Sequence, residues 1–306
     1  MTAPAVAILL ATYNGARNLA EQLDSFAAQT HPPALVLVSD DGSTDATRDI
    51  LARFATAHPA LPLQVLEGPQ QGSAANFLSL LARCPEDIDM ACFSDQDDVW
   101  LENKIARAVA QLGNTDPQLY CARTWECDDD LSNRRISRLP PKPAGFRNAL
   151  VQNIAAGNTI MLNRAALDLA RTAAARTGEV AVHDWWVYQL MTGAGARVIF
   201  DPEAVLLYRQ HAGNLIGANR GMLATLRRLR HLFTGTFRRW NDINIAALEV
   251  SAAHLTEENR ALLRHFARAR TQGPRARIAM LRKTGFYRQG RLGQASLWLA
   301  AMLGRL

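Results

Sequence analysis

The sequence predicts an α/β domain with a mostly parallel sheet flanked by helices, followed by a basic α-helical extension. Short apolar runs alternate with longer segments in which apolar residues recur every three or four positions, as strands alternating with amphipathic helices do. The end of the chain differs in charge: residues 220–306 hold 17 Lys or Arg and 4 Asp or Glu. At 306 residues and 48% hydrophobic content, the chain can bury a sizeable core.

The first part of the chain shows repeated strand–helix units. Apolar residues 5–11 predict a strand, and Leu19, Leu23 and Phe26 then recur at helical spacing until a proline pair ends the segment. Residues 39–45 are polar and glycine-containing, which predicts a turn and a helix cap. Further strands are expected at 35–38, 63–66 and 88–93, with helices ending near 54, spanning 76–82 and starting near 101.

The second part is less regular. Residues 121–145 are expected to be a long connecting loop, because they combine an acidic triplet, adjacent arginines and a proline-rich stretch. Further on, strands are expected at 156–161 and 204–207, with helices at 162–172 and from about 183. The basic extension predicts amphipathic helices, among them 243–255, 262–266 and 297–303.

Several classes of protein are disfavoured. No basic region precedes the N-terminal apolar run, and no apolar stretch approaches the roughly 20 residues of a spanning helix, so neither export nor a membrane span is expected. The four cysteines lack metal-site spacing and are expected to be reduced thiols. The chain also lacks Gly-x-Gly-x-x-Gly after its first strand and a phosphate-binding P-loop, which argues against a dinucleotide oxidoreductase.

Polar clusters follow three of the expected strands, at residues 12–14, 40–41 and 95–98. In parallel sheets, ligands collect beyond the carboxyl ends of the strands, so these clusters are expected to form one site. The third cluster places three carboxylates within four residues, where mutual repulsion favours a bound divalent cation such as Mg²⁺ or Mn²⁺. The alternative is an acidic loop that caps the following helix.

The strand ends carry three motifs: Ala11-Thr12-Tyr13-Asn14-Gly15, Val38-Ser39-Asp40-Asp41-Gly42-Ser43-Thr44-Asp45 and Ser94-Asp95-Gln96-Asp97-Asp98-Val99-Trp100. In this order and spacing they resemble the motifs of family 2 inverting glycosyltransferases of the GT-A fold. The resemblance implies a nucleoside-diphosphate-sugar donor and one divalent metal ion, Mg²⁺ or Mn²⁺. It implies a catalytic domain at 1–217, with a nucleotide-binding half at 1–127 and an acceptor half at 145–217, and an extension at 218–306. The donor nucleotide is then expected to contact Thr12, Tyr13, Asp40, Asp41, Asn76 and Asp95, and the metal Asp97.

A second motif, Ala181-Val182-His183-Asp184-Trp185-Trp186, offers a general base. Asp184 matches the family's catalytic aspartate, with His183 in place of the glutamate that often precedes it. Trp185 and Trp186 would then form the floor of an acceptor site to which Asn158 also contributes, since aromatic faces pack on sugar C–H groups. The alternative is a helix start capped by Asp184, with both tryptophans in the core.

The block from Tyr208 to Gly217 resembles the closing motif of bacterial rhamnosyltransferase-like members of the family. By that resemblance His211 is a second metal ligand, Arg209 neutralises phosphate, and dTDP-L-rhamnose is the donor, giving an α-L-rhamnoside. The alternative donor is a UDP-hexose such as UDP-galactose or UDP-glucose. The less favoured alternative for the whole protein is a non-catalytic function, in which it binds a sugar nucleotide or nucleic acid.

The basic extension is expected to dock on an anionic membrane surface, where a lipid-linked, for example undecaprenyl-linked, cell-surface glycan would be the acceptor. This places the protein in the cytoplasm, peripherally at the inner face of the plasma membrane. Nucleic acid is not an expected partner, because the arginines of the extension alternate with leucines and not with aromatic residues. A solvated helix face remains the alternative for this charge.

Overall fold

The computed structural model describes residues 3–113, 115–210 and 234–306. Its strands form one mixed sheet in the order β3-β2-β1-β4-β8-β6-β9-β5, with β7 paired to β6 outside this path. The strands are β1 (Val6–Thr12), β2 (Leu35–Asp40), β3 (Leu63–Glu67), β4 (Met90–Ser94), β5 (Val99–Trp100), β6 (Gln118–Cys127), β7 (Arg135–Ile136), β8 (Met161–Leu162) and β9 (Arg197–Arg209). The predicted α/β class is therefore confirmed.

Helices cover the sheet and continue beyond it. Those of the first 210 residues are α1 (Leu19–Ala27), α2 (Thr47–Ala57), α3 (Ser73–Arg83), α4 (Lys104–Gln111), α5 (Phe146–Ala149), α6 (Arg164–Ala174) and α7 (His183–Gly193), with a 3₁₀ turn η1 (Gly157–Thr159). The extension forms α9 (Thr236–Val250), the 3₁₀ turn η2 (Ala252–His254), α10 (Glu257–Arg270), α11 (Pro274–Thr284) and α12 (Arg291–Leu303). Its predicted helical character is confirmed for 234–306.

Two expected segments differ from the structure. The predicted loop at 121–145 is wrong at its start, because ten-residue strand β6 runs through 127 and pairs in parallel with β9. Half-buried Arg123 and Glu126 interrupt the apolar pattern of this strand, whereas the acidic triplet, the arginines and the prolines that predicted a loop all follow it. The predicted strand at 156–161 is mostly the η1 turn, and only the two-residue β8 follows it.

The parallel strands at the centre of the sheet bring the predicted polar clusters together. β1 lies between β2 and β4, with Thr12 opposite Asp40 and Leu10 opposite Ser94. The three strands therefore end at the same side of the sheet, and the loops that carry 12–14, 40–45 and 95–98 emerge next to one another. This arrangement follows from the fully buried apolar runs of the strands, which only a sheet covered on both faces can accommodate.

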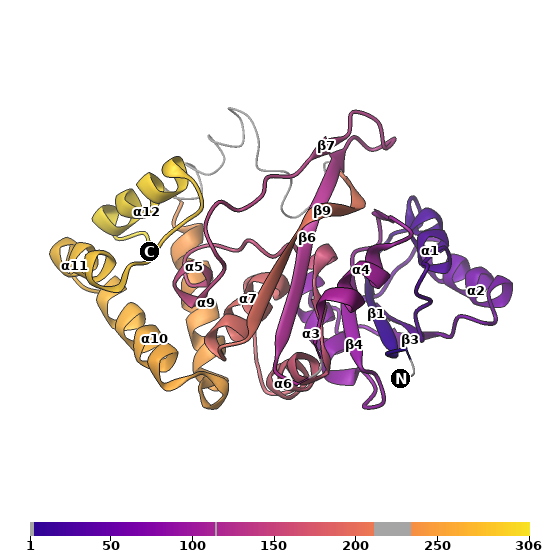
Figure 1. Ribbon diagram of the computed structural model, residues 1–306, viewed down its shortest axis with the longest axis horizontal. Helices are drawn as coiled ribbons and strands as arrows, with labels where there is room; N and C mark the ends of the chain where they lie inside the picture. The colour runs from indigo at the N-terminus through magenta and orange to yellow at the C-terminus, as the bar shows by residue number, and fades with distance from the viewer. Residues whose placement is uncertain (1–2, 114, 211–233) are drawn as a thin grey trace.

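The helices of the extension share a core with the sheet domain. One hydrophobic cluster contains Leu9 of β1 and Phe77 of α3, and it also contains Leu248, Phe266 and Leu297 of the extension. Burying one such side chain stabilises the fold by about 1.5–3 kcal/mol relative to leaving it exposed. In Figure 1 α10, α11 and α12 lie at the opposite end of the molecule from β1, α1 and α2. The boundary predicted at residue 217 falls outside the described ranges.

Candidate active site

The ends of β1 and β2 form a hydrogen-bonded unit around the buried carboxylate of Asp40. Its Oδ1 accepts from Thr12 Oγ1 at 3.0 Å, and its Oδ2 accepts from Arg48 Nε at 2.7 Å. The hydroxyl and main-chain N–H of Ser43 occupy the remaining positions. Burial alone would raise the pKa of Asp40, but these hydrogen bonds outweigh it and hold the pKa below its usual value. With its acceptor positions filled, Asp40 shapes the loop in this conformation. The nucleoside contact predicted for it stays a prediction.

Two further residues that were predicted to contact the donor nucleotide form hydrogen bonds at the same side of the sheet. Asp41 accepts hydrogen bonds from the main-chain N–H groups of Gln70 and Gly72, at 2.6 and 2.9 Å. The buried amide of Asn76 donates to the main-chain oxygen of Ser39 at 2.9 Å. In this conformation both side chains hold the backbone around the end of β2, and the buried Oδ1 of Asn76 has no hydrogen-bond partner among the described residues. The nucleotide contacts predicted for both residues stay predictions.

Tyr13 differs, because its side chain is 58% exposed at the end of β1 and can stack on a base. The amide of Gln96 fixes its backbone: Gln96 Oε1 accepts from the Tyr13 N–H at 2.8 Å, and Nε2 donates to the Tyr13 oxygen at 3.0 Å. A side chain at Gly15 would overlap this amide. Gln96 is therefore a positioning residue, a role that its place inside the acidic motif does not reveal.

A buried network lies below the acidic loop. Asp98 Oδ2 accepts from Asn158 Nδ2 at 2.6 Å, and the Asn158 main-chain oxygen accepts from Lys104 Nζ at 2.8 Å. Lys104 also lies 3.0 Å from the centre of the Trp100 ring, and its burial lowers its pKa to about 7. The pKa of Asp98 lies well above its usual value, first because of burial and then because of repulsion from Asp97 and Asp95.

The candidate base belongs to the same electrostatic environment as the acidic loop. The pKa of Asp95 rises to about 7 because of burial and of the negative charges of Asp97 and Asp184. Asp184 comes from α7 and the other two carboxylates from the loop after β4. The structure therefore brings together the residues predicted to serve the donor and the acceptor, although about 90 positions separate them in the sequence.

Asp184 lies in the first turn of α7, against the η1 turn. Its Oδ2 accepts from the Gly157 N–H at 3.0 Å, whereas its buried Oδ1 forms no hydrogen bond of ordinary geometry within the described part of the chain. Burial raises the pKa of Asp184 to about 6, and the N–H groups of Gly157 and Trp185 and the side chain of Asn153 partly offset that rise. His183 is buried against Phe77, with ring centroids 3.8 Å apart, and burial lowers its pKa to about 3. It is therefore a neutral packing residue behind Asp184.

The tryptophans do not form the predicted acceptor floor. Trp186 is fully buried in the core, which corrects its assignment to a sugar site. Trp185 is 5% exposed and donates from Nε1 to the Ala149 oxygen at 2.7 Å, so it also acts mainly in packing. Asn158 is committed to Asp98 and Lys104, as described above, and its predicted acceptor contact is likewise replaced by a positioning role. A sequence pattern alone cannot distinguish an exposed tryptophan pair from a buried one.

Arg209 and His211 were predicted to serve the phosphates and the metal. The buried guanidinium of Arg209 forms an ion pair with Glu21 and donates to the Asp129 main-chain oxygen, so it is engaged with protein groups here. His211 lies outside the described residues. Within those residues, no group of three or more His, Cys, Asp or Glu side chains is arranged to hold a metal ion. Mg²⁺ bound together with a substrate's phosphates needs only one or two protein carboxylates, and the half-buried acidic loop would offer the oxygen donors that this ion prefers.

Comparison with known proteins identifies relatives over most of the chain. Residues 7–168 match the model of the family described as glycosyl transferase family 2. The dTDP-rhamnosyl transferase RfbG of Shigella flexneri is 27% identical over 229 residues, which cover 72% of this chain and 78% of the relative.

Solved structures share the fold. A mannosyltransferase from Pyrobaculum calidifontis, in complex with GDP-Man and Mn²⁺, is 20% identical with a TM-score of 0.54, covering 100% of this chain and 88% of that one. Residues 1–349 of TarS from S. aureus, in complex with UDP-GlcNAc, are 16% identical with a TM-score of 0.58, covering 97% and 79%. At these identities the likeness concerns the fold, which is GT-A.

Proposed function

Because this chain belongs to glycosyl transferase family 2, we propose that it transfers L-rhamnose, with inversion, from dTDP-L-rhamnose to a hydroxyl of a lipid-linked bacterial glycan. The observation that carries the proposal is that adjacent residues of η1 join the two sets of carboxylates: Gly157 donates to Asp184 and Asn158 donates to Asp98, while the charge of Asp184 raises the pKa of Asp95. An inverting displacement needs a leaving diphosphate on one face of the sugar and a base for the acceptor hydroxyl on the other. Carboxylates from two separate elements meet that requirement.

On the donor side, the exposed ring of Tyr13 stacks on the base, and Asp95 accepts hydrogen bonds from the ribose. Asp97, with His211, would hold Mg²⁺ or Mn²⁺. When bound, the ion stabilises the negative charge that builds on the departing diphosphate. Other side chains position the loops that carry Tyr13, Asp95 and Asp97. They are Asp40, Asp41, Asn76 and Gln96, which hydrogen-bond to groups of these loops and of the end of β2.

On the acceptor side, Asp184 takes the proton of the attacking hydroxyl. Its Oδ2 is held by the Gly157 N–H, and Oδ1 forms no hydrogen bond of ordinary geometry with a described residue, so one oxygen is oriented and the other can receive the proton. A pKa of about 6 leaves Asp184 mostly ionised at neutral pH and gives it more basicity than an ordinary aspartate.

The identity of the donor rests on the similarity to the Shigella dTDP-rhamnosyl transferase and on the motif near Arg209. Calorimetric titration of the purified protein with dTDP-L-rhamnose, UDP-glucose and UDP-galactose in Mg²⁺ tests it. We expect dTDP-L-rhamnose to bind at least tenfold more tightly than either UDP-hexose, a difference of about 1.4 kcal/mol. Tighter binding of a UDP-hexose would keep the enzyme class and contradict rhamnose as the donor.

We also propose that α11 and α12 dock on an anionic membrane, peripherally at the cytoplasmic face, where a lipid-linked acceptor would be presented. None of the helices described here is long and apolar enough to cross a bilayer. Leu292, at 80% exposure, and half-exposed Met302 project from α12, and exposed Arg275, Arg282 and Lys283 project from α11. α11 and α12 contact each other, and exposed apolar and basic side chains on such a pair of helices suit the headgroup region of an anionic membrane.

Flotation with anionic liposomes tests the membrane proposal. At low salt we expect the full-length protein to float with the vesicles, and the triple variant Arg275→Glu, Arg282→Glu, Lys283→Glu to stay in the soluble fraction. Each basic residue near such a surface contributes about 1 kcal/mol of attraction, so reversing these three charges should remove several kcal/mol of binding free energy. Arg53→Glu, an exposed site on α2 at the opposite end of the molecule, is the matched control and should float. Recovery of the unmodified protein in the soluble fraction would contradict the proposal.

A further inference from the structure

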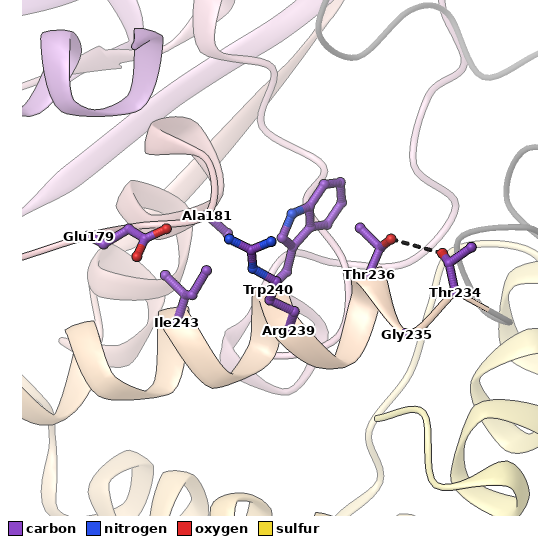
Figure 2. Close-up of a pocket in the computed structure, with 8 residues that line it drawn as sticks. All are labelled: Glu179, Ala181, Thr234, Gly235, Thr236, Arg239, Trp240 and Ile243. Atoms are coloured by element: carbon purple, nitrogen blue, oxygen red, sulfur yellow. Dashed lines mark hydrogen bonds between the residues drawn. The ribbon is translucent and has the colours of Figure 1, made fainter. Parts of the chain in front are cut away.

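A pocket of about 370 Å³ lies between the N-terminal half of α9 and the segment that leads into α7. Figure 2 shows Arg239, Trp240 and Ile243 rising from α9 on one side, with Glu179 and Ala181 on the other. Thr234 and Thr236 line one end and share a hydrogen bond at 2.9 Å. None of these residues belongs to the carboxylate site.

The pocket adjoins the candidate base through two structural connections. Ala181 precedes Asp184 by three residues in the chain and lines the pocket. Trp185, which follows Asp184, packs edge-on against Trp240 with ring centroids 6.2 Å apart. The indole of Trp240 is thus both a wall of the pocket and a neighbour of the residue next to the base, so a ligand here lies beside the acceptor side of the site.

The chemistry of the lining selects a class of ligand. The half-buried indole and Ile243 offer an apolar wall against which the C–H face of a sugar ring packs. The exposed side chains of Glu179 and Arg239 form no hydrogen bond or ion pair with other described residues, so both are available to bind vicinal hydroxyls in a bidentate manner. One acidic and one basic group balance each other, which disfavours a phosphate, and two charges disfavour a purely apolar ligand.

We propose that this pocket is a saccharide subsite, which binds a neutral sugar unit of the acceptor glycan beside the unit that carries the reacting hydroxyl. The proposal rests on the proposed glycosyltransferase function and deepens it. It also replaces the predicted acceptor floor: the aromatic surface offered to the acceptor is that of Trp240 on α9, while Trp185 and Trp186 pack behind it.

The neighbouring arginines of α9 provide a matched pair of variants. Arg239 lines the pocket, whereas Arg238, also exposed, does not line it, and its main-chain oxygen accepts a hydrogen bond from Arg270. An array of bacterial oligosaccharides, including rhamnose-containing ones, is incubated with dTDP and one of four full-length proteins. These are the unmodified protein and the variants Arg239→Ala, Glu179→Gln and Arg238→Ala. Dissociation constants for bound saccharides are then measured by interferometry.

We expect the unmodified protein to bind at least one saccharide. Arg239→Ala and Glu179→Gln should weaken that binding about tenfold or more, whereas Arg238→Ala should bind with the affinity of the unmodified protein. Equal binding by Arg239→Ala and Arg238→Ala would overturn the subsite. Absence of any saccharide binding by a protein that consumes sugar nucleotide would also overturn it, while leaving the enzyme function standing. Saccharide binding without sugar-nucleotide consumption would support the pocket and count against the proposed function.

Discussion

Replacing Asp184 with asparagine should lower the turnover number by about 10²–10⁴-fold, the typical cost of losing a general base. Asparagine has the same shape, and its oxygen can still accept the hydrogen bond that the Gly157 N–H now donates to Asp184. Folding and dTDP binding should therefore remain close to those of the unmodified protein, and thermal unfolding with and without dTDP checks this. Steady-state transfer kinetics measure the loss of turnover.

The pH dependence of turnover provides an independent readout of the same residue. Because burial raises the pKa of Asp184 to about 6, the base is protonated below that pH, and turnover of the unmodified protein should fall as pH drops through about 6. The residual activity of Asp184→Asn should lack this fall. Unchanged turnover in the variant would remove Asp184 from the proton-transfer step. The same acid limb in both proteins would assign that limb to another group, such as Asp95 with its pKa of about 7.

Replacing Gly157 with alanine should reduce turnover by about 10²-fold while leaving dTDP affinity near its original value. A Cβ at this position would lie 2.7 Å from His183 Nε2 and 3.2 Å from Asp184 Cβ. The His183 ring cannot yield, because it is stacked on Phe77 and lies edge-on to Phe93. The start of α7 must therefore move, and a displacement of about 1 Å in a reacting group can cost this much.

Gly178→Ala is the matched control for this substitution. Gly178 lies five residues before His183, and a Cβ there would meet no atom within 4 Å, so its turnover should stay within about twofold of the unmodified protein. Comparing the two alanine variants separates displacement of Asp184 from a general effect of removing a glycine. A Gly157→Ala protein that turns over as fast as Gly178→Ala would show that the contact between η1 and α7 does not position the base.

The donor side of the site was predictable because sequence order sets it directly. Parallel strands place their carboxyl ends together, so polar residues after β1, β2 and β4 had to meet whatever the details of packing. Asp184 was predictable through resemblance alone, since the sequence contains no local sign that α7 begins beside the acidic loop. That contact depends on how η1 and α7 pack, which is a tertiary property.

The roles of individual polar side chains were less predictable. Asp40 and Asn158 look like ligand-binding groups in the sequence, but each is used to hold backbone or buried charge. Lys104 looks like an ordinary helix residue, yet it lies buried beneath the acidic loop. A hydrogen-bonding side chain serves a ligand or the protein depending on which partners the fold brings within 3 Å, and spacing along the chain does not contain that information.

The most direct test of the account is the release of nucleoside diphosphate, detected by mass spectrometry, when the purified full-length protein is incubated with sugar nucleotides and a glycan acceptor mixture in Mg²⁺ or Mn²⁺. We expect dTDP release from dTDP-L-rhamnose, abolished by EDTA and restored by excess metal. Undiminished release in EDTA would contradict the metal role assigned to Asp97. Absence of release from every sugar nucleotide, with dTDP and UDP also failing to raise the unfolding temperature, would contradict the central claim that this chain is a sugar-nucleotide-dependent transferase.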